Sequence, residues 1–166
     1  MKEDSHTEKK TVDPEDSGST KDCRISAADS PAAKGSELAA RSDLPALEEI
    51  MKILLSPQGC PWDRKQTHET LIKYMREETE EVAQAVIKQD WENLKEELGD
   101  CLLQIAFHCE IARLEGHFTM ADVIRGINSK MVRRHPHVFG EKTAENPEAV
   151  LKLWNEIKKK EKEDKK

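Results

Sequence analysis

Apolar residues recur at three- and four-residue intervals through most of the chain after residue 43, which is the spacing of amphipathic helices. No run alternates apolar and polar residues as a half-buried strand would. The pattern predicts helices over 44–55, from Thr67 to about Gln89, from near Trp91 to Glu115, from Thr119 to near His135, and from Pro147 onward. Because the connections are short, we expect an all-α antiparallel helical bundle.

Capping residues mark the ends of several of these helices. Thr67, followed by Thr70, suits the start of the second helix, and Gly116 suits the end of the third. Thr119 precedes an acid three residues later, which is a variant of the capping box. Asn146 and the proline after it predict the start of the last helix.

The segment before Leu44 has a different composition. All seven aromatic residues lie between Trp62 and Trp154, and residues 1–43 hold few large apolar residues among Ser, Ala, Lys, Asp and Glu. Such a segment buries too little apolar surface to offset the entropy of ordering it. We therefore predict a disordered extension over 1–43, a helical domain over 44–162 and a charged tail over 163–166.

Composition narrows the class of partner. The 166 residues include 33 acids and 27 bases, for a net charge of -6, which disfavours binding to nucleic acid. No apolar run reaches the roughly 18 residues of a membrane span, and the first residues have no apolar stretch of a signal peptide. The four cysteines form no CxxC pair. We expect a cytoplasmic protein that binds neither nucleic acid nor membrane.

Acidic residues interrupt the apolar stripes of the second and third helices. Glu78 falls inside one stripe and Glu81 at its edge, while Glu97 borders the other and Asp100 lies one step further round. The stripes comprise Leu71, Met75, Val82, Ala85 and Val86 in the second helix, and Leu94, Leu98, Cys101, Leu102, Ile105, Cys109 and Ala112 in the third.

These two pairs would meet if the helices pack antiparallel, because they lie at comparable distances from the turn at Asp90. Four converging carboxylates repel one another, and one or two divalent cations would offset that repulsion. An all-oxygen set suits Mg²⁺, with Mn²⁺ as a substitute. Two alternatives stay open: the acids are ordinary solvated faces, or they hold two irons, although no histidine occupies the position that a di-iron motif uses.

A basic group and a tryptophan in a predicted loop complete the candidate chemistry. Lys130, Arg133 and Arg134 can share one helix face and bind phosphates, or they can complement the negative end of the helix dipole. Trp62, in a loop rich in proline and glycine, either plugs the core or stacks on a nucleobase.

Taken in order, these motifs resemble the MazG family of nucleoside triphosphate pyrophosphohydrolases. The resemblance spans about Leu47 to Lys160. It rests on Cys60-Pro61-Trp62-Asp63, Glu77-Glu78-Thr79-Glu80-Glu81, Glu97-Leu98-Gly99-Asp100 and Arg133-Arg134-His135-Pro136-His137-Val138-Phe139.

The resemblance implies an all-α MazG-like fold, a homodimer or higher homo-oligomer, and Mg²⁺-dependent hydrolysis of NTPs or dNTPs between the α- and β-phosphates. The products would be a nucleoside monophosphate and pyrophosphate, as suits house-cleaning or control of nucleotide pools. The family's metal ligands match Glu78, Glu81, Glu97 and Asp100, and its first acid matches Glu77. Either Glu77 or Glu81 would orient the attacking water. Lys130, Arg133 and Arg134 match triphosphate contacts.

One departure from the family concerns copy number. Some members carry two copies of this domain, whereas this chain has one behind an unmatched extension. An alternative function is a helical module that senses or binds NTPs without turnover. The intact set of four acids favours an enzyme.

Overall fold

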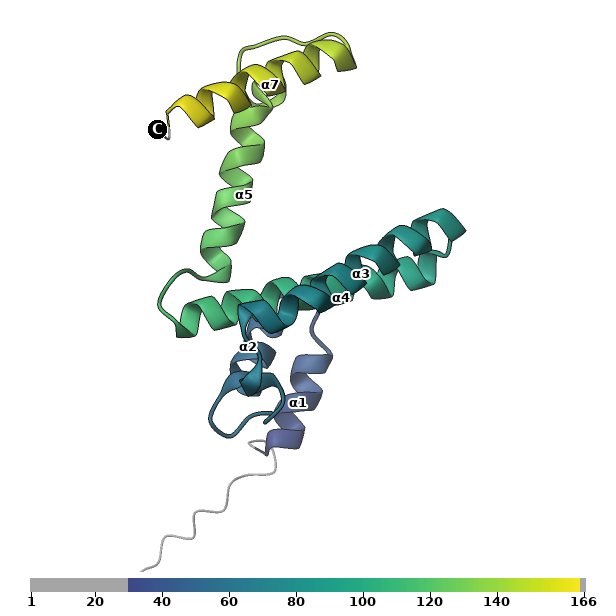
Figure 1. The fold of residues 1–166 in the computed structure, drawn as a ribbon, viewed down its shortest axis with the longest axis vertical. Helices are drawn as coiled ribbons and strands as arrows, with labels where there is room; N and C mark the ends of the chain where they lie inside the picture. The colour runs from purple at the N-terminus through teal and green to yellow at the C-terminus, as the bar shows by residue number, and fades with distance from the viewer. Residues whose placement is uncertain (1–29, 165–166) are drawn as a thin grey trace, which may run out of the picture. The chain divides into compact units, whose positions relative to one another are not determined.

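The computed structural model describes residues 30–164, and every regular element in this part of the chain is helical (Figure 1). The elements are α1 (Pro31–Ala39), α2 (Leu44–Leu55), the 3-10 turn η2 (Asp63–Lys65), α3 (His68–Lys88), α4 (Trp91–Leu114), α5 (Met120–Arg134), the one-turn α6 (Pro136–Phe139) and α7 (Pro147–Glu163). The predicted all-α class is therefore confirmed.

Helix α1 lies within the segment for which the sequence predicts disorder. The Ser30 hydroxyl accepts a hydrogen bond from the Ala33 amide, and Pro31 occupies the first helical position, so the helix has a capped start. Leu38 is buried and, with Leu102 of α4, lines an apolar cavity beside α2. Residues 31–39 of the predicted extension thus form a short helix, with Ser30 as its cap and Leu38 buried. The first 29 residues of the predicted extension lie outside the described part of the chain.

The chain divides into a unit over Met1–Ser36 and a unit over Glu37–Lys166, and the second unit carries α2 to α7. Here the local signals hold. Thr67 and Thr119 form capping boxes with Thr70 and Asp122 at the starts of α3 and α5. Asn146 caps α7 through the amide of Ala149.

The turn that joins α3 to α4 is short enough to make the two helices antiparallel neighbours. Gln89 adopts a left-handed conformation with φ 55°, and the Asp90 carboxylate then accepts a hydrogen bond from the Asn93 amide to cap α4. The two helices run side by side over most of their length (Figure 1). This hairpin is the part of the fold that carries the acidic residues.

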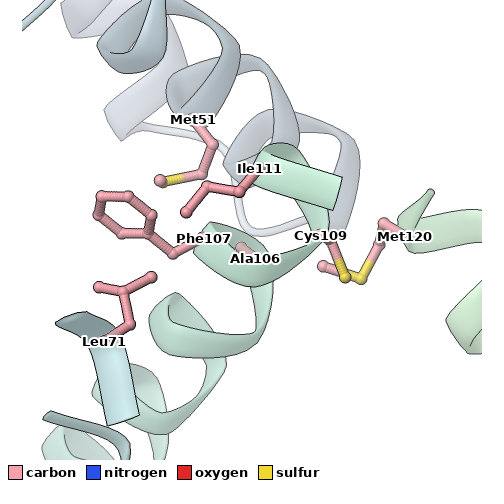
Figure 2. Packing of buried hydrophobic residues seen from close by; sticks show 7 residues of the cluster. All are labelled: Met51, Leu71, Ala106, Phe107, Cys109, Ile111 and Met120. Atoms are coloured by element: carbon pink, nitrogen blue, oxygen red, sulfur yellow. The ribbon is translucent and has the colours of Figure 1, made fainter. Parts of the chain in front are cut away.

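The hydrophobic core surrounds the C-terminal half of α4. It joins α2, α3 and α5 to that helix through a buried cluster (Figure 2) of Met51, Leu71, Ala106, Phe107, Cys109, Ile111 and Met120. Burial of each large side chain in such a cluster contributes about 1.5–3 kcal/mol. The core therefore holds one end of the hairpin firmly, while the acids lie nearer the other end.

The apolar stripe predicted for α4 is only partly correct. Cys109 and Ala112 are buried as expected, but Leu98, Leu102 and Ile105 are exposed. Val86, predicted to lie on the stripe of α3, is also exposed. The reason is tertiary: α2 and α5 pack on the C-terminal half of α4, so burial there extends around the helix, whereas the described core does not reach its N-terminal half.

Helix α7 packs against α5 and contributes no fully buried residue. Trp154 of α7 meets the His135 ring edge-on, with 5.2 Å between the ring centroids. Arg133 and Arg134 also form ion pairs with Glu161 of α7. Among the described helices, none is long and apolar enough to span a bilayer.

Candidate functional site

The α3–α4 hairpin brings acids from both helices together. Ligand oxygens of Glu78, Glu81 and Glu97 all lie within 4.8 Å of one another. Glu78 and Glu81 are one turn apart on α3, and Glu97 faces them from α4 because the two helices run in opposite directions. The convergence predicted from residue spacing thus occurs for these three carboxylates, which together could hold a metal ion.

Asp100 belongs to the same electrostatic environment. Burial first, and then the negative charges of Asp100, Glu81 and Glu77, raise the pKa of Glu78 above its ordinary value. Burial also raises the pKa of Glu97, and the charges of Glu81, Asp100 and Glu78 add to the effect. Glu77 is exposed and lies at the margin of the group.

A close contact between the carboxyl groups of Glu81 and Glu97 also raises the pKa of Glu97. Two carboxylates can share such a contact only when a proton, or a cation in its place, lies between them. Within residues 30–164 no Lys, Arg or His forms an ion pair with any of the acids in this group. The protein itself supplies the acids with no counter-charge from this region.

Cys101 is a neighbour of the acids that sequence reasoning assigned only to the apolar stripe. Burial, followed by the charges of Glu78, Glu97 and Asp100, raises the pKa of its thiol. The thiol therefore stays protonated and is a poor nucleophile or metal ligand at neutral pH. The position of Cys101 next to Asp100 in sequence was the one indication that it would lie near the acids. In the structure the thiol borders the acidic group and stays protonated.

Trp62 is connected to the acidic face of α3 through Tyr74. The two rings meet edge-on with centroids 5.9 Å apart, and Tyr74 precedes Glu78 by one helical turn. Trp62 is still 53% exposed, so it is not a plug of the core. Gly59, in the loop before it, packs so closely on the carbonyls of Ile53 and Leu54 that a Cβ there would clash. The loop therefore holds a solvent-facing indole against Tyr74 of α3.

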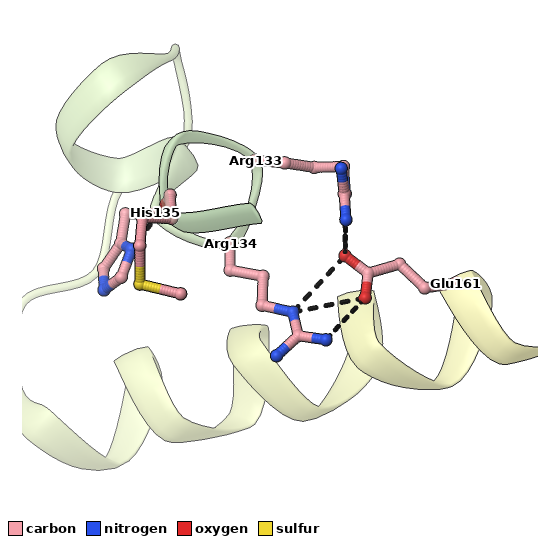
Figure 3. Close-up of polar contacts among 5 residues, drawn as sticks. Arg133, Arg134, His135 and Glu161 are labelled. Carbon is pink, nitrogen blue, oxygen red and sulfur yellow. Dashed lines mark hydrogen bonds and ion pairs between the residues drawn. The ribbon is translucent and has the colours of Figure 1, made fainter. Parts of the chain in front are cut away.

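The basic residues at the end of α5 contact α7 rather than the acidic helices. Arg133 and Arg134 both pair with Glu161, at 2.7 and 2.6 Å (Figure 3). Lys130 is exposed on the same helix. The structure thus brings two of the three predicted phosphate contacts together, through an acid that sequence reasoning treated as part of a solvated helix end. A glutamate among lysines carried no signal of this pairing, because its partners lie 27 and 28 residues earlier.

A histidine pair lies toward the opposite end of the hairpin from the acids. The Nδ1 atoms of His68 and His108 are 2.7 Å apart, and the rings are almost parallel with centroids 5.0 Å apart. The centroid separation equals the nitrogen–nitrogen distance plus one ring radius on each side. The rings are therefore coplanar and joined edge to edge by one shared proton. Burial first, and then the charge of His68, lower the pKa of His108.

Comparisons with known proteins agree with this geometry. The family model described as the MazG nucleotide pyrophosphohydrolase domain matches residues 66–139, which include α3, α4 and α5. A nucleoside triphosphate pyrophosphohydrolase/pyrophosphatase MazG from Thermotoga maritima is 52% identical over 72% of this chain and 46% of its own length. A nucleoside triphosphate pyrophosphohydrolase from Escherichia coli is 46% identical over 66% of this chain and 42% of its own length.

The chain spans less than half the length of these two curated relatives. A solved structure is matched over almost its whole length. The crystal structure of a MazG-related protein from Thermotoga maritima is 34% identical, with a TM-score of 0.60, and the match covers 70% of this chain and 99% of that one. The fold, the acids of α3 and α4, and these matches together show that the chain belongs to the MazG family.

Proposed function

We propose that this protein hydrolyses nucleoside triphosphates between the α- and β-phosphates, releasing a nucleoside monophosphate and pyrophosphate. The observation that carries the proposal is the convergence of Glu78, Glu81 and Glu97 on one point, with Asp100 beside them and no cationic side chain from the described residues to neutralise them. The names of the two curated relatives describe the same activity.

The donor set fits Mg²⁺. It offers only carboxylate oxygens. Burial first, and then the negative charges of the neighbouring acids, raise the pKa values of Glu78 and Glu97, and a divalent cation at this point would offset that charge. Glu78, Glu81, Glu97 and Asp100 would hold the ion. When bound, Mg²⁺ would supply charge neutralisation of the phosphates and a bound water of lowered pKa.

The remaining roles fall to residues around this group. Glu77, exposed at its margin, or Glu81 would accept the proton of the attacking water and so orient it. Lys130 and Arg133 carry the positive charge that the triphosphate and the leaving pyrophosphate require. The exposed indole of Trp62 offers a π-face on which any nucleobase can stack, and this favours broad base specificity.

A product-resolved assay tests the proposal. Incubation with ATP or dNTPs and Mg²⁺ should yield the monophosphate and pyrophosphate, separated by ion-exchange chromatography. In H₂¹⁸O, mass spectrometry should find the label in one product only, which identifies the phosphorus that water attacks. The variant Glu97→Gln should lose turnover at least 100-fold, since one ligand of the ion is neutralised.

The neighbouring variant Glu96→Gln provides the matched control. Glu96 is exposed on the same helix and outside the acidic group, so its neutralisation should leave the rate within about twofold. ADP and orthophosphate as products would contradict the proposed bond cleavage. Tight binding of a non-hydrolysable NTP analogue with no turnover would instead support the nucleotide-sensing alternative.

The exposed apolar surface supports a homo-oligomer as part of the same proposal. Leu98, Leu102 and Ile105 form an exposed apolar row on α4, next to the acids, and Leu151 is exposed on α7. Apolar groups gathered along a helix are costly in water and mark interfaces. A second copy of the chain on the α4 row would bury it and close the acidic group from solvent.

Light scattering coupled to size-exclusion chromatography tests this assembly. The protein should elute as a dimer or larger oligomer, and Leu98→Glu should shift it toward the monomer. Leu114→Glu is a control on the same helix, because Leu114 is also exposed but lies at the far end from the acids. A monomer at micromolar concentration, or equal dissociation by both variants, would refute assembly through the α4 row.

A further inference from the structure

Glu161 of α7 binds two arginines at once. Its Oε1 accepts from Nε of Arg133 at 2.7 Å, and its Oε2 accepts from Nη2 of Arg134 at 2.6 Å. Together these contacts lower the pKa of Glu161 to about 2, with the hydrogen bonds to Arg134 and Arg133 as the largest causes. The carboxylate is therefore ionised at any pH at which the protein would work.

The two arginines are in different surroundings. The Arg134 side chain is only 14% exposed and lies over the Trp154 ring, with 5.0 Å between its guanidinium carbon and the ring centroid. It contacts both oxygens of Glu161. The Arg133 side chain is 52% exposed and contacts only Oε1 (Figure 3). Arg134 thus anchors α7 to α5, whereas Arg133 keeps much of its guanidinium toward solvent.

Without Glu161, the two adjacent guanidiniums at the end of α5 would repel each other. Arg133 would then favour rotamers that point away from Arg134. The shared carboxylate removes that repulsion and ties Arg133 to a fixed place on α7. The side chain of Glu161 is itself only 17% exposed, so the tie is partly shielded from solvent. The group as a whole keeps one net positive charge, presented by Arg133.

We propose that Glu161 is a positioning residue for polyphosphate binding, which holds the exposed guanidinium of Arg133 ready for a phosphate while Arg134 serves as the structural anchor. The inference rests on the proposed function, because it takes Arg133 to be a phosphate contact. It also divides the two arginines of the basic cluster expected from the sequence into one binding residue, Arg133, and one structural residue, Arg134.

The test is a double-mutant cycle read out by the affinity for magnesium pyrophosphate, measured by isothermal titration calorimetry on the full chain. Arg133→Gln should weaken binding about tenfold or more, as expected for loss of a charge-assisted contact. Glu161→Gln should weaken it about fivefold in the wild-type background and should have no further effect in the Arg133→Gln background. Glu156→Gln, an exposed acid of the same helix, should change nothing.

Thermal unfolding of the same variants separates anchoring from positioning. Glu161→Gln should lower Tm in both backgrounds, since it breaks the contact with Arg134 in each. An equal loss of pyrophosphate affinity in both backgrounds would mean that Glu161 acts only by holding α7, and tighter binding by Glu161→Gln would mean that it competes with phosphate. Either result, or no binding by the wild type at millimolar concentration, would overturn the inference.

The pyrophosphate measurement is independent of turnover. If the wild type binds magnesium pyrophosphate and the cycle behaves as stated, but NTPs are not cleaved, then the proposed function fails while the role of Glu161 stands. If NTPs are cleaved and the cycle shows independent effects, the function stands and the role of Glu161 fails.

Discussion

Neutralising Glu78 should make the protein more stable when no divalent cation is present and less stable, relative to wild type, when Mg²⁺ is added. Glu78 lies within 4.8 Å of two other carboxylates, measured between ligand atoms. At that separation two unit charges repel by about 3–4 kcal/mol at an effective dielectric constant of about 20, and by about 1 kcal/mol in water. Because the site is largely open to solvent, we expect Glu78→Gln to gain about 1 kcal/mol in EDTA.

A gain of this size should raise Tm by about 3–5 °C in a domain of this length. Added Mg²⁺ should make wild type more stable than Glu78→Gln. At ten times its dissociation constant, a ligand that binds only the folded state stabilises it by about 1.4 kcal/mol, and the variant lacks one of the acids that would hold the ion. Differential scanning fluorimetry of both proteins, in EDTA and in a magnesium titration, measures the Mg²⁺ concentration at which the two Tm values become equal.

The dependence on pH follows from the same repulsion. The pKa of Glu78 is raised in the folded protein above the unfolded value of 4.5, so the folded state binds the proton more tightly. In EDTA, wild-type stability should therefore rise as pH falls through the raised pKa toward 4.5, and Glu78→Gln should show less of this rise.

Glu80→Gln is the matched control, because Glu80 is an exposed acid of the same helix and bonds Gln84 instead of the acidic group. It should change neither the stability in EDTA nor the response to Mg²⁺. A loss of stability of Glu78→Gln in EDTA, or equal stabilisation of wild type and Glu78→Gln by Mg²⁺, would refute the repulsion among these acids.

Three further predictions concern other parts of the molecule. Trp62→Ala should weaken binding of a non-hydrolysable NTP analogue about fivefold or more, the usual worth of base stacking, and leave Tm nearly unchanged because the indole is half exposed. An unchanged dissociation constant by calorimetry would assign Trp62 to the loop alone. Met51→Ala should cost about 2–5 kcal/mol in urea unfolding, since Met51 is fully buried in the core; a loss below about 1 kcal/mol would mean that the core collapses around the gap. The pKa of His108 is lowered in the folded state, so the unfolded state binds more protons and stability should fall as pH drops below about 6.5. His108→Gln should flatten this fall in a Tm–pH profile while His117→Gln, at an exposed site, should not, and equal profiles would exclude His108 as the titrating group.

Much of the site could be predicted from local spacing. Three residues separate Glu78 from Glu81, and three separate Glu97 from Asp100. A turn at Gln89 and Asp90 is enough to set the two helices antiparallel. Helix periodicity and turn length are properties of short segments, and capping residues such as Thr67 act within one turn. The all-α class, the α3–α4 hairpin and the meeting of three acids therefore followed from the chain itself.

The tertiary structure decided what lies around each helix. Periodicity finds an apolar face but not the neighbour that covers it, so Leu98 and Phe107, both apolar residues of α4, look alike in sequence although only the second is buried. The same limit applies to charge. Whether Arg134 meets phosphate or Glu161 depends on a contact across 27 residues, and long-range contacts are set by packing of whole elements rather than by local pattern. Sequence alone determined which residues could form the acidic site; packing determined which arginine is largely buried against Glu161 and which keeps a half-exposed side chain.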